Sequence, residues 1–261
     1  MSDSKAKPVR KAATIMLVRS ASNGIEVFML QRPGRGAFPD LHVFPGGKVE
    51  TSDEGFDSLC DSLSDAAASK IVSVCGNGLS YWIAAIRECF EECSVLLANQ
   101  CGQQFAFRNS EHIKEFDDAR HALASDELDF KQFLVENGLN LATSRVHYFS
   151  HWITPKFAPA RFNTRFFLAE MPEQQLAVEH STELVSGTWI APKHALELHA
   201  KGEWQMIVPT LTSLRMLCGY ESTRSLIDTV RTGGHKIPVT PSLHVQGIQY
   251  DPNRWLSSST T

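Results

Sequence analysis

The sequence predicts one globular domain of the α/β or α+β class, enlarged by additional helices. Three observations lead to this prediction. Runs typical of β-strands alternate with segments of helical periodicity along most of the chain, and such mixtures pack as layers around one core. No internal repeat is present, and no linker is long enough to separate two domains. The composition, 43% hydrophobic and 21% charged residues, is that of an ordinary folded protein.

The first part of the chain is predicted to form strands. Residues 13–19 and 25–31 are β-type runs, and the Asn23-Gly24 pair between them favours a hairpin. Residues 41–47 are expected to form a short strand that Pro45 and two glycines bring to an end. Residues 51–80 are polar, but their apolar side chains recur at helical spacing, which predicts a helix closed by Asn77 and Gly78.

The clearest helix in the sequence covers residues 80–98, where apolar side chains follow helical intervals. Residues 110–138 are predicted to form two further helices that are broken near Ser125. Further strands are predicted at 145–153, 161–169 and 184–190. Further helices are predicted at 193–200, directly after Pro192, and at 208–218 and 222–231.

Several classes of protein are excluded by composition. The 25 basic and 29 acidic residues give a net charge of −4, without the basic excess of a dedicated nucleic-acid-binding protein. No apolar stretch is long enough to span a membrane. Six cysteines occur without a Cys-x-x-Cys pair, so neither a disulfide scaffold nor a zinc ribbon is expected. We therefore expect free thiols in a reducing compartment, the cytoplasm.

Three glutamates of the predicted helix 80–98 indicate a possible metal site. Glu88, Glu91 and Glu92 stand at positions i, i+3 and i+4, which share one face of a helix. Carboxylates this close repel one another unless a cation lies among them or water solvates them all. Hard cations such as Mg²⁺ and Mn²⁺ prefer such oxygen ligands. Arg87 can orient Glu91, and a solvated acidic face is the competing interpretation.

A second motif, Phe44-Pro45-Gly46-Gly47, precedes this helix. Paired glycines after a strand allow the backbone to approach a ligand or a metal without interference from a Cβ atom. Taken alone, the motif also fits an ordinary turn at the end of a strand.

Together the two motifs resemble the signature of the Nudix hydrolases. Gly47 matches its first glycine, residues 87–93 match its Arg-Glu-x-x-Glu-Glu core, and Val95 matches its last apolar position. Asp53 stands where the family has glutamate, and Ser94 replaces the closing glycine. The signature is also split, because 33 residues (54–86) separate Asp53 from Arg87 where the family has seven. Asp53 and Ser94 are expected to touch the loop and the helix end, not the metal-binding carboxylates.

The split signature is similar to that of the subgroup typified by the mammalian peroxisomal acyl-coenzyme A diphosphatase. The similarity extends patchily over residues 11–215 and includes the segments 28–32, 38–47, 151–155, 161–167 and 183–192. The resemblance implies an α/β/α sandwich with a mixed β-sheet and a single domain over residues 1–261. The additions would be an insertion at 54–79, a helical segment at 99–144 and C-terminal helices at 192–232.

The resemblance also implies an activity. Nudix hydrolases cleave a diphosphate linked to another group, with Mg²⁺ or Mn²⁺ as cofactor. The implied metal ligands are Glu88, Glu91, Glu92 and the carbonyl of Gly46. The implied catalytic residues are Glu91, Glu92, Arg87 and Glu183, with Glu179 as a second candidate from a later loop.

The expected partner is a small nucleoside diphosphate derivative. Coenzyme A or an acyl-coenzyme A and other diphosphates are equally compatible substrates at this point. Candidate phosphate-binding side chains are Arg32, Arg35, Lys48, Arg161 and Arg165, since arginine and lysine recognise phosphate. The spacing of Arg32 and Arg35 to Phe44 does not match the signature of coenzyme A-directed relatives. The oligomeric state stays open, and a homodimer is possible.

Two other functions are compatible with the sequence. A catalytically silent Nudix-fold sensor would bind a nucleotide without turnover, although three retained carboxylates speak against a retired site. A thiol-based redox protein would use Cys89 and Cys93, one helical turn apart, but packed thiols on a buried helix face are commoner. His147 and His151 are predicted to lie on one face of a strand. They could form a platform for the substrate, or they could be ordinary histidines of the core or of a sheet edge.

Overall fold

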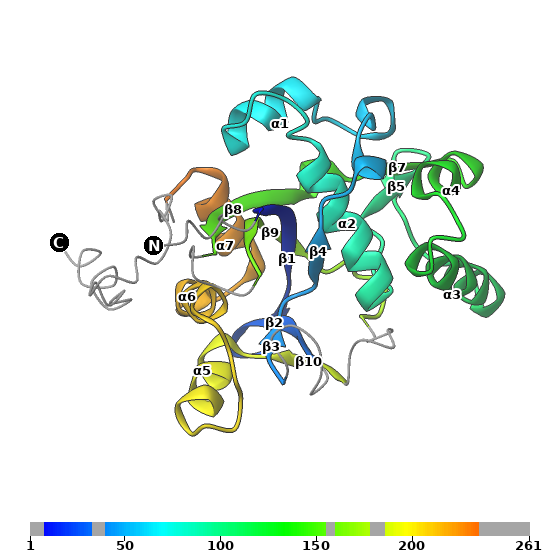
Figure 1. The fold of residues 1–261 in the computed structure, drawn as a ribbon. Helices are drawn as coiled ribbons and strands as arrows, with labels where there is room; N and C mark the ends of the chain where they lie inside the picture. The colour runs from blue at the N-terminus through cyan, green and yellow to red at the C-terminus, as the bar shows by residue number, and fades with distance from the viewer. Residues whose placement is uncertain (1–7, 33–39, 155–159, 178–185, 235–261) are drawn as a thin grey trace.

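The computed structural model describes residues 8–32, 40–154, 160–177 and 186–234. Its centre is a mixed sheet in which β10, β2, β1, β9 and β8 lie side by side (Figure 1). Strand β1 pairs parallel with β9, and the other pairs of this sheet are antiparallel. The strands of the sheet are β1 (Arg10–Ala21), β2 (Gly24–Gln31), β3 (His42–Val43), β4 (Gly46–Lys48), β8 (Val146–Ile153), β9 (Phe162–Glu170) and β10 (Ser186–Ile190).

Helices cover both faces of the sheet (Figure 1). Side chains that alternate along β1 point to two separate cores, Ile15 and Leu17 to one and Met16 and Val18 to the other. The first core contains the helices α1 (Asp65–Val72), α2 (Ser80–Cys93), α3 (Ser110–Ala124) and α4 (Phe130–Glu136). The second contains α5 (Pro192–Ala200), α6 (Val208–Leu217) and α7 (Thr223–Arg231). The predicted α/β/α sandwich with a mixed sheet is therefore confirmed.

The predicted hairpin is confirmed, since Ala21 pairs with Gly24 across a two-residue loop. Residues 41–47 differ from the prediction because Gly46 and Gly47 do not end a strand. They belong to β4, which pairs antiparallel with the first half of β1, with Ala13 opposite Gly47 and Thr14 opposite Gly46. The motif therefore continues the sheet beside α2 and does not leave it.

The helix expected over residues 51–80 is largely wrong. Only α1 is helical there, and the preceding residues form the single 3₁₀ turns Thr51–Asp53 and Asp57–Leu59. Phe56 lies fully buried between these turns, so its helical spacing reflects burial without a helix. Ser64 caps the start of α1, since its side chain accepts the N–H of Ala67. Asp65 closes the insertion, since its carboxylate accepts the N–H groups of Asn77 and Leu79.

The segment 99–144 is helical only in part. It contains α3 and α4, as predicted, and the break near Ser125 is confirmed. It also contains short strands that form a second sheet with the order β6, β5, β7. These strands are β5 (Ala98–Gln100), β6 (Gln103–Gln104) and β7 (Leu139–Leu141), too short for a recognisable alternation in the sequence.

Candidate metal and catalytic site

Helix α2 places the three glutamates, because its other sides are held in the core. Apart from Glu88, Glu91 and Glu92, each of its residues is buried. The helix ends at Ser94, whose left-handed backbone (φ 58°) brings its N–H within 3.0 Å of the Phe90 carbonyl. The predicted helix end at residue 98 is thus four to five residues too late. Glycine is the residue that adopts this conformation most easily, and serine does so here at some cost.

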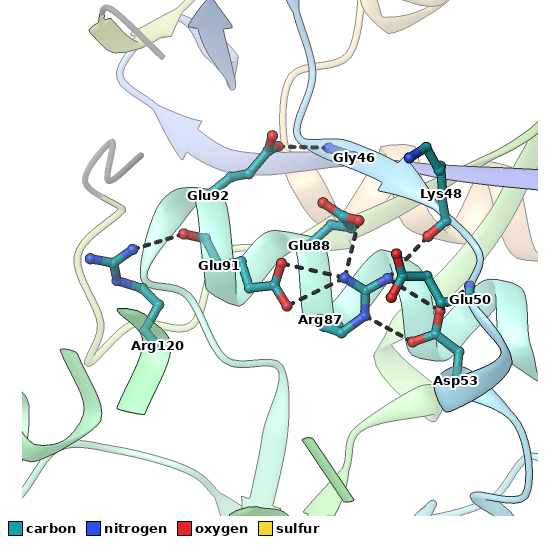
Figure 2. A network of polar contacts seen from close by, with 9 residues as sticks. All are labelled: Gly46, Lys48, Glu50, Asp53, Arg87, Glu88, Glu91, Glu92 and Arg120. Atoms are coloured by element: carbon teal, nitrogen blue, oxygen red, sulfur yellow. Dashed lines mark hydrogen bonds and ion pairs between the residues drawn. The ribbon is translucent and has the colours of Figure 1, made fainter. Parts of the chain in front are cut away.

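The strand β4 lies directly opposite these carboxylates (Figure 2). The N–H of Gly46 donates a hydrogen bond of 2.8 Å to Oε2 of Glu92. The carboxylate of Glu88 lies against Gly47, at a place that a Cβ atom of residue 47 would occupy. The backbone of the Pro-Gly-Gly motif and the acidic face of α2 therefore form one site.

Arg87 connects the acidic residues of the site (Figure 2). Its Nη1 lies 3.1 Å from Oε1 of Glu88 and 3.3 Å from both carboxylate oxygens of Glu91. Its Nε and Nη2 donate to the two carboxylate oxygens of Asp53, at 2.8 and 3.2 Å, and Nη2 also donates to the carbonyl of Lys48 at 3.0 Å. Such two-pronged contacts fix the guanidinium in one orientation.

Asp53 has a larger role than the sequence suggested. Within the described residues it forms no hydrogen bond or ion pair with Glu88, Glu91 or Glu92, but it pairs with Arg87, the arginine that holds Glu88 and Glu91. Its side chain is 1% exposed and also accepts the N–H of Glu50 at 2.8 Å. Arg87 forms ion pairs with Asp53, Glu88 and Glu91.

The site is short of positive charge. Burial and the neighbouring carboxylates raise the pKa of Glu88 to about 7 and that of Glu92 to about 8, although the contacts of Arg87 and Gly46 act in the opposite direction. Burial also raises the pKa of Glu91. Without a further cation, the site therefore favours protonated carboxyls near neutral pH.

The stability of the metal-free protein is expected to depend on these protons. Because the folded state holds them above the ordinary pKa of 4.5, this contribution to stability is fully present below pH 4.5 and is lost as pH rises to about 8. Glu92→Gln is neutral at every pH, so its melting temperature should exceed that of the wild type increasingly between pH 5 and pH 8.5. Thermal denaturation in EDTA measures the difference, and a difference that does not change with pH would contradict the assignment.

The two glycines are expected to respond differently to substitution. Gly46 has φ 156°, and a Cβ atom there would overlap the backbone at Ala13, so Gly46→Ala should lower stability. At Gly47 the nearest atoms that a Cβ atom would meet belong to the movable carboxylate of Glu88. Gly47→Ala should therefore keep the melting temperature within a few degrees but displace Glu88 and lower activity. Melting curves and hydrolysis rates of the two variants, measured side by side, test this contrast.

The donor set fits a hard divalent cation. Carboxylate and backbone oxygens are the ligands that Mg²⁺ and Mn²⁺ prefer, and the excess of negative charge would be neutralised by such an ion. Within the described ranges no three acidic, histidine or cysteine side chains form a ready-made metal site. Instead Glu91 turns to Arg87, and Glu92 turns to Gly46 (Figure 2). A cation there would have to compete with these contacts.

Comparison with known proteins decides the family. The model of the "NUDT19 Nudix domain" matches residues 61–217, more than half of the chain. This chain belongs to the Nudix family. A curated relative from Xenopus laevis, "Acyl-coenzyme A diphosphatase NUDT19", is 26% identical over 84% of this chain and 64% of its own length. The human protein of the same name is 24% identical over 78% of this chain and 64% of its own length.

A solved structure shows the same fold. The Nudix hydrolase from Alicyclobacillus acidocaldarius matches with a TM-score of 0.72 at 23% identity, over 86% of this chain and 97% of the other. This chain spans 64% of the length of each of the two curated relatives named above, less than two thirds. Asp53, which replaces the glutamate of the Nudix signature, forms a buried ion pair with Arg87, the arginine of that signature, although the long insertion separates the two residues in sequence.

The predicted phosphate-binding residues do not form one cluster. Arg32 lies close enough to Glu92 to oppose the rise of its pKa that burial causes, and Lys48 is exposed on β4 beside Arg87. Arg161 lies at the start of β9, where its Nε donates to the Thr154 carbonyl. Arg165 is buried beside the end of α1, where it donates to the Val72 carbonyl. Arg35, Glu179 and Glu183 lie outside the described residues.

Two residues near the site were not predicted. Arg120 of α3 is 1% exposed and its Nη1 donates to the main-chain carbonyl of Glu91 at 3.0 Å, which holds the last turn of α2 (Figure 2). Glu50 lies next to Asp53 and raises the pKa of Glu91. Spacing along the sequence gives no signal for Arg120, because it reaches the site from a separate helix.

The cysteines are not arranged for redox chemistry. Cys89 and Cys93 are fully buried in the first core, and each of the six cysteines is free of a disulfide. Their burial favours packing over reaction with a dissolved oxidant. None of the helices in the described ranges has the length and apolar character to cross a bilayer.

Proposed function

We propose that this Nudix protein hydrolyses the diphosphate linkage of a small nucleotide derivative with the help of Mg²⁺ or Mn²⁺. The observation that supports this most strongly is the geometry of α2 against β4. Glu88 and Glu92 are forced against glycine backbone, in a place where both hold protons unless a cation replaces them. Ionised carboxylates at this site destabilise the folded protein, and a bound cation would neutralise their charge.

Each residue of the site has a role in this proposal. Glu88, Glu91 and Glu92 hold the cation, together with the carbonyl of Gly46. Arg87 and Asp53 are positioning residues. Arg87 fixes Glu88 and Glu91 by ion pairs and also donates to the Lys48 carbonyl of β4, and Asp53 holds Arg87 in place. When bound, the cation neutralises diphosphate charge and activates a water for attack on phosphorus. Glu91 or Glu183 would accept the proton of that water.

We further propose coenzyme A or an acyl-coenzyme A as the substrate. The support is the name of the relatives, acyl-coenzyme A diphosphatase, at 24–26% identity. The 3′-phosphate and the diphosphate of such a molecule need cationic side chains. Arg32 lies close enough to Glu92 to interact with its charge, and Lys48 belongs to β4 beside the carboxylates. The free thiols also lead us to propose the cytoplasm as its location, which cell fractionation tests.

A panel of diphosphates tests both levels of the proposal. Coenzyme A, an acyl-coenzyme A, NADH, ADP-ribose and a nucleoside triphosphate are incubated with Mg²⁺, with Mn²⁺ or with EDTA, and the products are separated by chromatography. Metal-dependent release of adenosine 3′,5′-bisphosphate from the coenzyme A substrates is the expected result. Turnover of another diphosphate alone would overturn the substrate assignment. Saturable nucleotide binding without any turnover would contradict the enzymatic function and favour a catalytically silent nucleotide sensor.

A further inference from the structure

Arg165 is a buried cation without a carboxylate partner. Its residue is 3% exposed, yet no acidic side chain in the described part of the chain lies within ion-pair distance of it. Its Nη2 donates to the Val72 carbonyl at 3.0 Å, its Nη1 donates to Asn163, and Nε has no hydrogen-bond partner. A guanidinium in this situation retains unused donors and an unbalanced charge, which is costly unless an anion joins it.

The surroundings of Arg165 form a cavity. Its volume is about 330 Å³, and it is lined by the end of α1, by residues 148–151 of β8 and by Arg165. The pairing of β8 with β9 is shifted between Tyr148 and Ser150, so one additional residue, Phe149, is inserted into β8. Such bulges turn a strand and redirect its side chains, and they are frequent next to binding sites.

The bulge also corrects the prediction for the two histidines of β8. His147 pairs with Leu168 and His151 with Arg165, three residues apart on β9, so the histidines lie on opposite faces. His151 is consequently the one beside Arg165, where its Nε2 lies 2.5 Å from Oδ1 of Asn163. The cavity thus combines a guanidinium with an imidazole on neighbouring strands.

A second cavity of about 580 Å³ adjoins the first and shares Ile71, Tyr148 and Phe149 with it. Apolar side chains such as Leu63, Trp82, Val146 and Val230 form much of its lining, and serine, threonine, His147 and Arg231 side chains complete it. The side chain of Ile71 is 47% exposed at the boundary of the two cavities, although large apolar side chains are usually covered. One end of this combined space holds the buried Arg165, and the other is mainly apolar, with the exposed Arg231 among its lining residues.

We propose that the combined space binds a small organic anion, with its phosphate or carboxylate group on Arg165 and its apolar part along the second cavity. This site is distinct from the carboxylate site. The Arg165 guanidinium lies over the ring of Tyr81 at the start of α2, seven residues before Glu88, or about 10 Å along a helix axis. The proposal does not depend on the diphosphatase activity, because binding alone tests it.

Calorimetric titration of the full-length protein in EDTA tests the proposal, with inorganic phosphate, acetate and decanoate as probes. Saturable binding of phosphate or decanoate is expected, and the two probes distinguish a phosphate from a fatty carboxylate as the bound group. If decanoate binds, acetate should bind at least tenfold more weakly, because it lacks the apolar part. Arg165→Gln should weaken the bound probe at least tenfold, whereas Arg145→Gln, at an exposed arginine before β8, should not.

Ile71→Glu gives a second test that does not disturb the buried arginine. It places a negative charge at the boundary of the cavities and should also weaken binding at least tenfold, while Ile113→Glu on α3 should have no effect. Equal binding by wild type, Arg165→Gln and Ile71→Glu would overturn the proposal. So would the absence of binding by folded wild-type protein, which would leave Arg165 with the single role of capping α1.

Discussion

Glu92→Gln is expected to reduce metal-dependent hydrolysis at least about a hundredfold. Metal ions stabilise the transition state by several kcal/mol, and each 1.4 kcal/mol corresponds to about a tenfold change in rate. The same substitution should raise the melting temperature of the metal-free protein at pH 8, since it removes a buried carboxylate that is charged only at a cost. Initial rates with saturating Mg²⁺ and melting curves in EDTA measure the two effects.

The combination of lower activity and higher stability is what distinguishes a metal ligand from a structural residue. Glu221→Gln, at an exposed glutamate before α7, is the matched control and should change neither quantity. A Glu92→Gln variant that melts earlier than the wild type at pH 8 would contradict our account, because the hydrogen bond to Gly46 would then stabilise the fold by itself.

Arg87→Met is expected to destabilise the protein by about 3–5 kcal/mol, because removal of one partner leaves a buried charge without compensation. Asp53 is the partner most affected, since it is 1% exposed and receives two hydrogen bonds from Arg87. Asp53→Asn keeps its size and should cost less, about 1–3 kcal/mol. Urea denaturation in EDTA gives these free energies of unfolding.

The double variant completes a thermodynamic cycle for this pair. If Arg87 and Asp53 act together, Arg87→Met should cost much less in an Asp53→Asn background than in the wild type. Additive effects of the two substitutions would show that Arg87 acts through Glu88 and Glu91 and that Asp53 has no part in the site. Arg87→Lys should preserve part of the stability but less of the activity, since lysine cannot make the two-pronged contact.

Long periodic segments were predictable from the sequence because one physical constraint dominates each of them. Helix α2 follows its apolar pattern, and β1, β2 and β9 follow theirs, since each is packed against a core. The end of α2 was placed too late because residues 95–97 are apolar and buried without being helical. Apolar spacing reports burial, and only the backbone conformation at Ser94 ends the helix.

The acidic face of the site was predictable from neighbouring positions on one helix, and its partners were not. Asp53 meets Arg87 only because the insertion folds back through α1 and its anchor at Asp65. Arg120 contacts α2 and Arg165 contacts α1 from elements that are distant in sequence, so no local spacing of residues predicts these contacts. Contacts that depend on tertiary structure leave no periodic signal.

Titration with Mn²⁺, followed by electron paramagnetic resonance of the free ion, tests the central claim most directly. Our account predicts saturable binding at pH 8 by the wild type and by Glu221→Gln, and binding at least tenfold weaker in Glu88→Gln and Glu92→Gln. Folded glutamine variants that bind Mn²⁺ as tightly as the wild type would contradict the assignment of these carboxylates as the metal site.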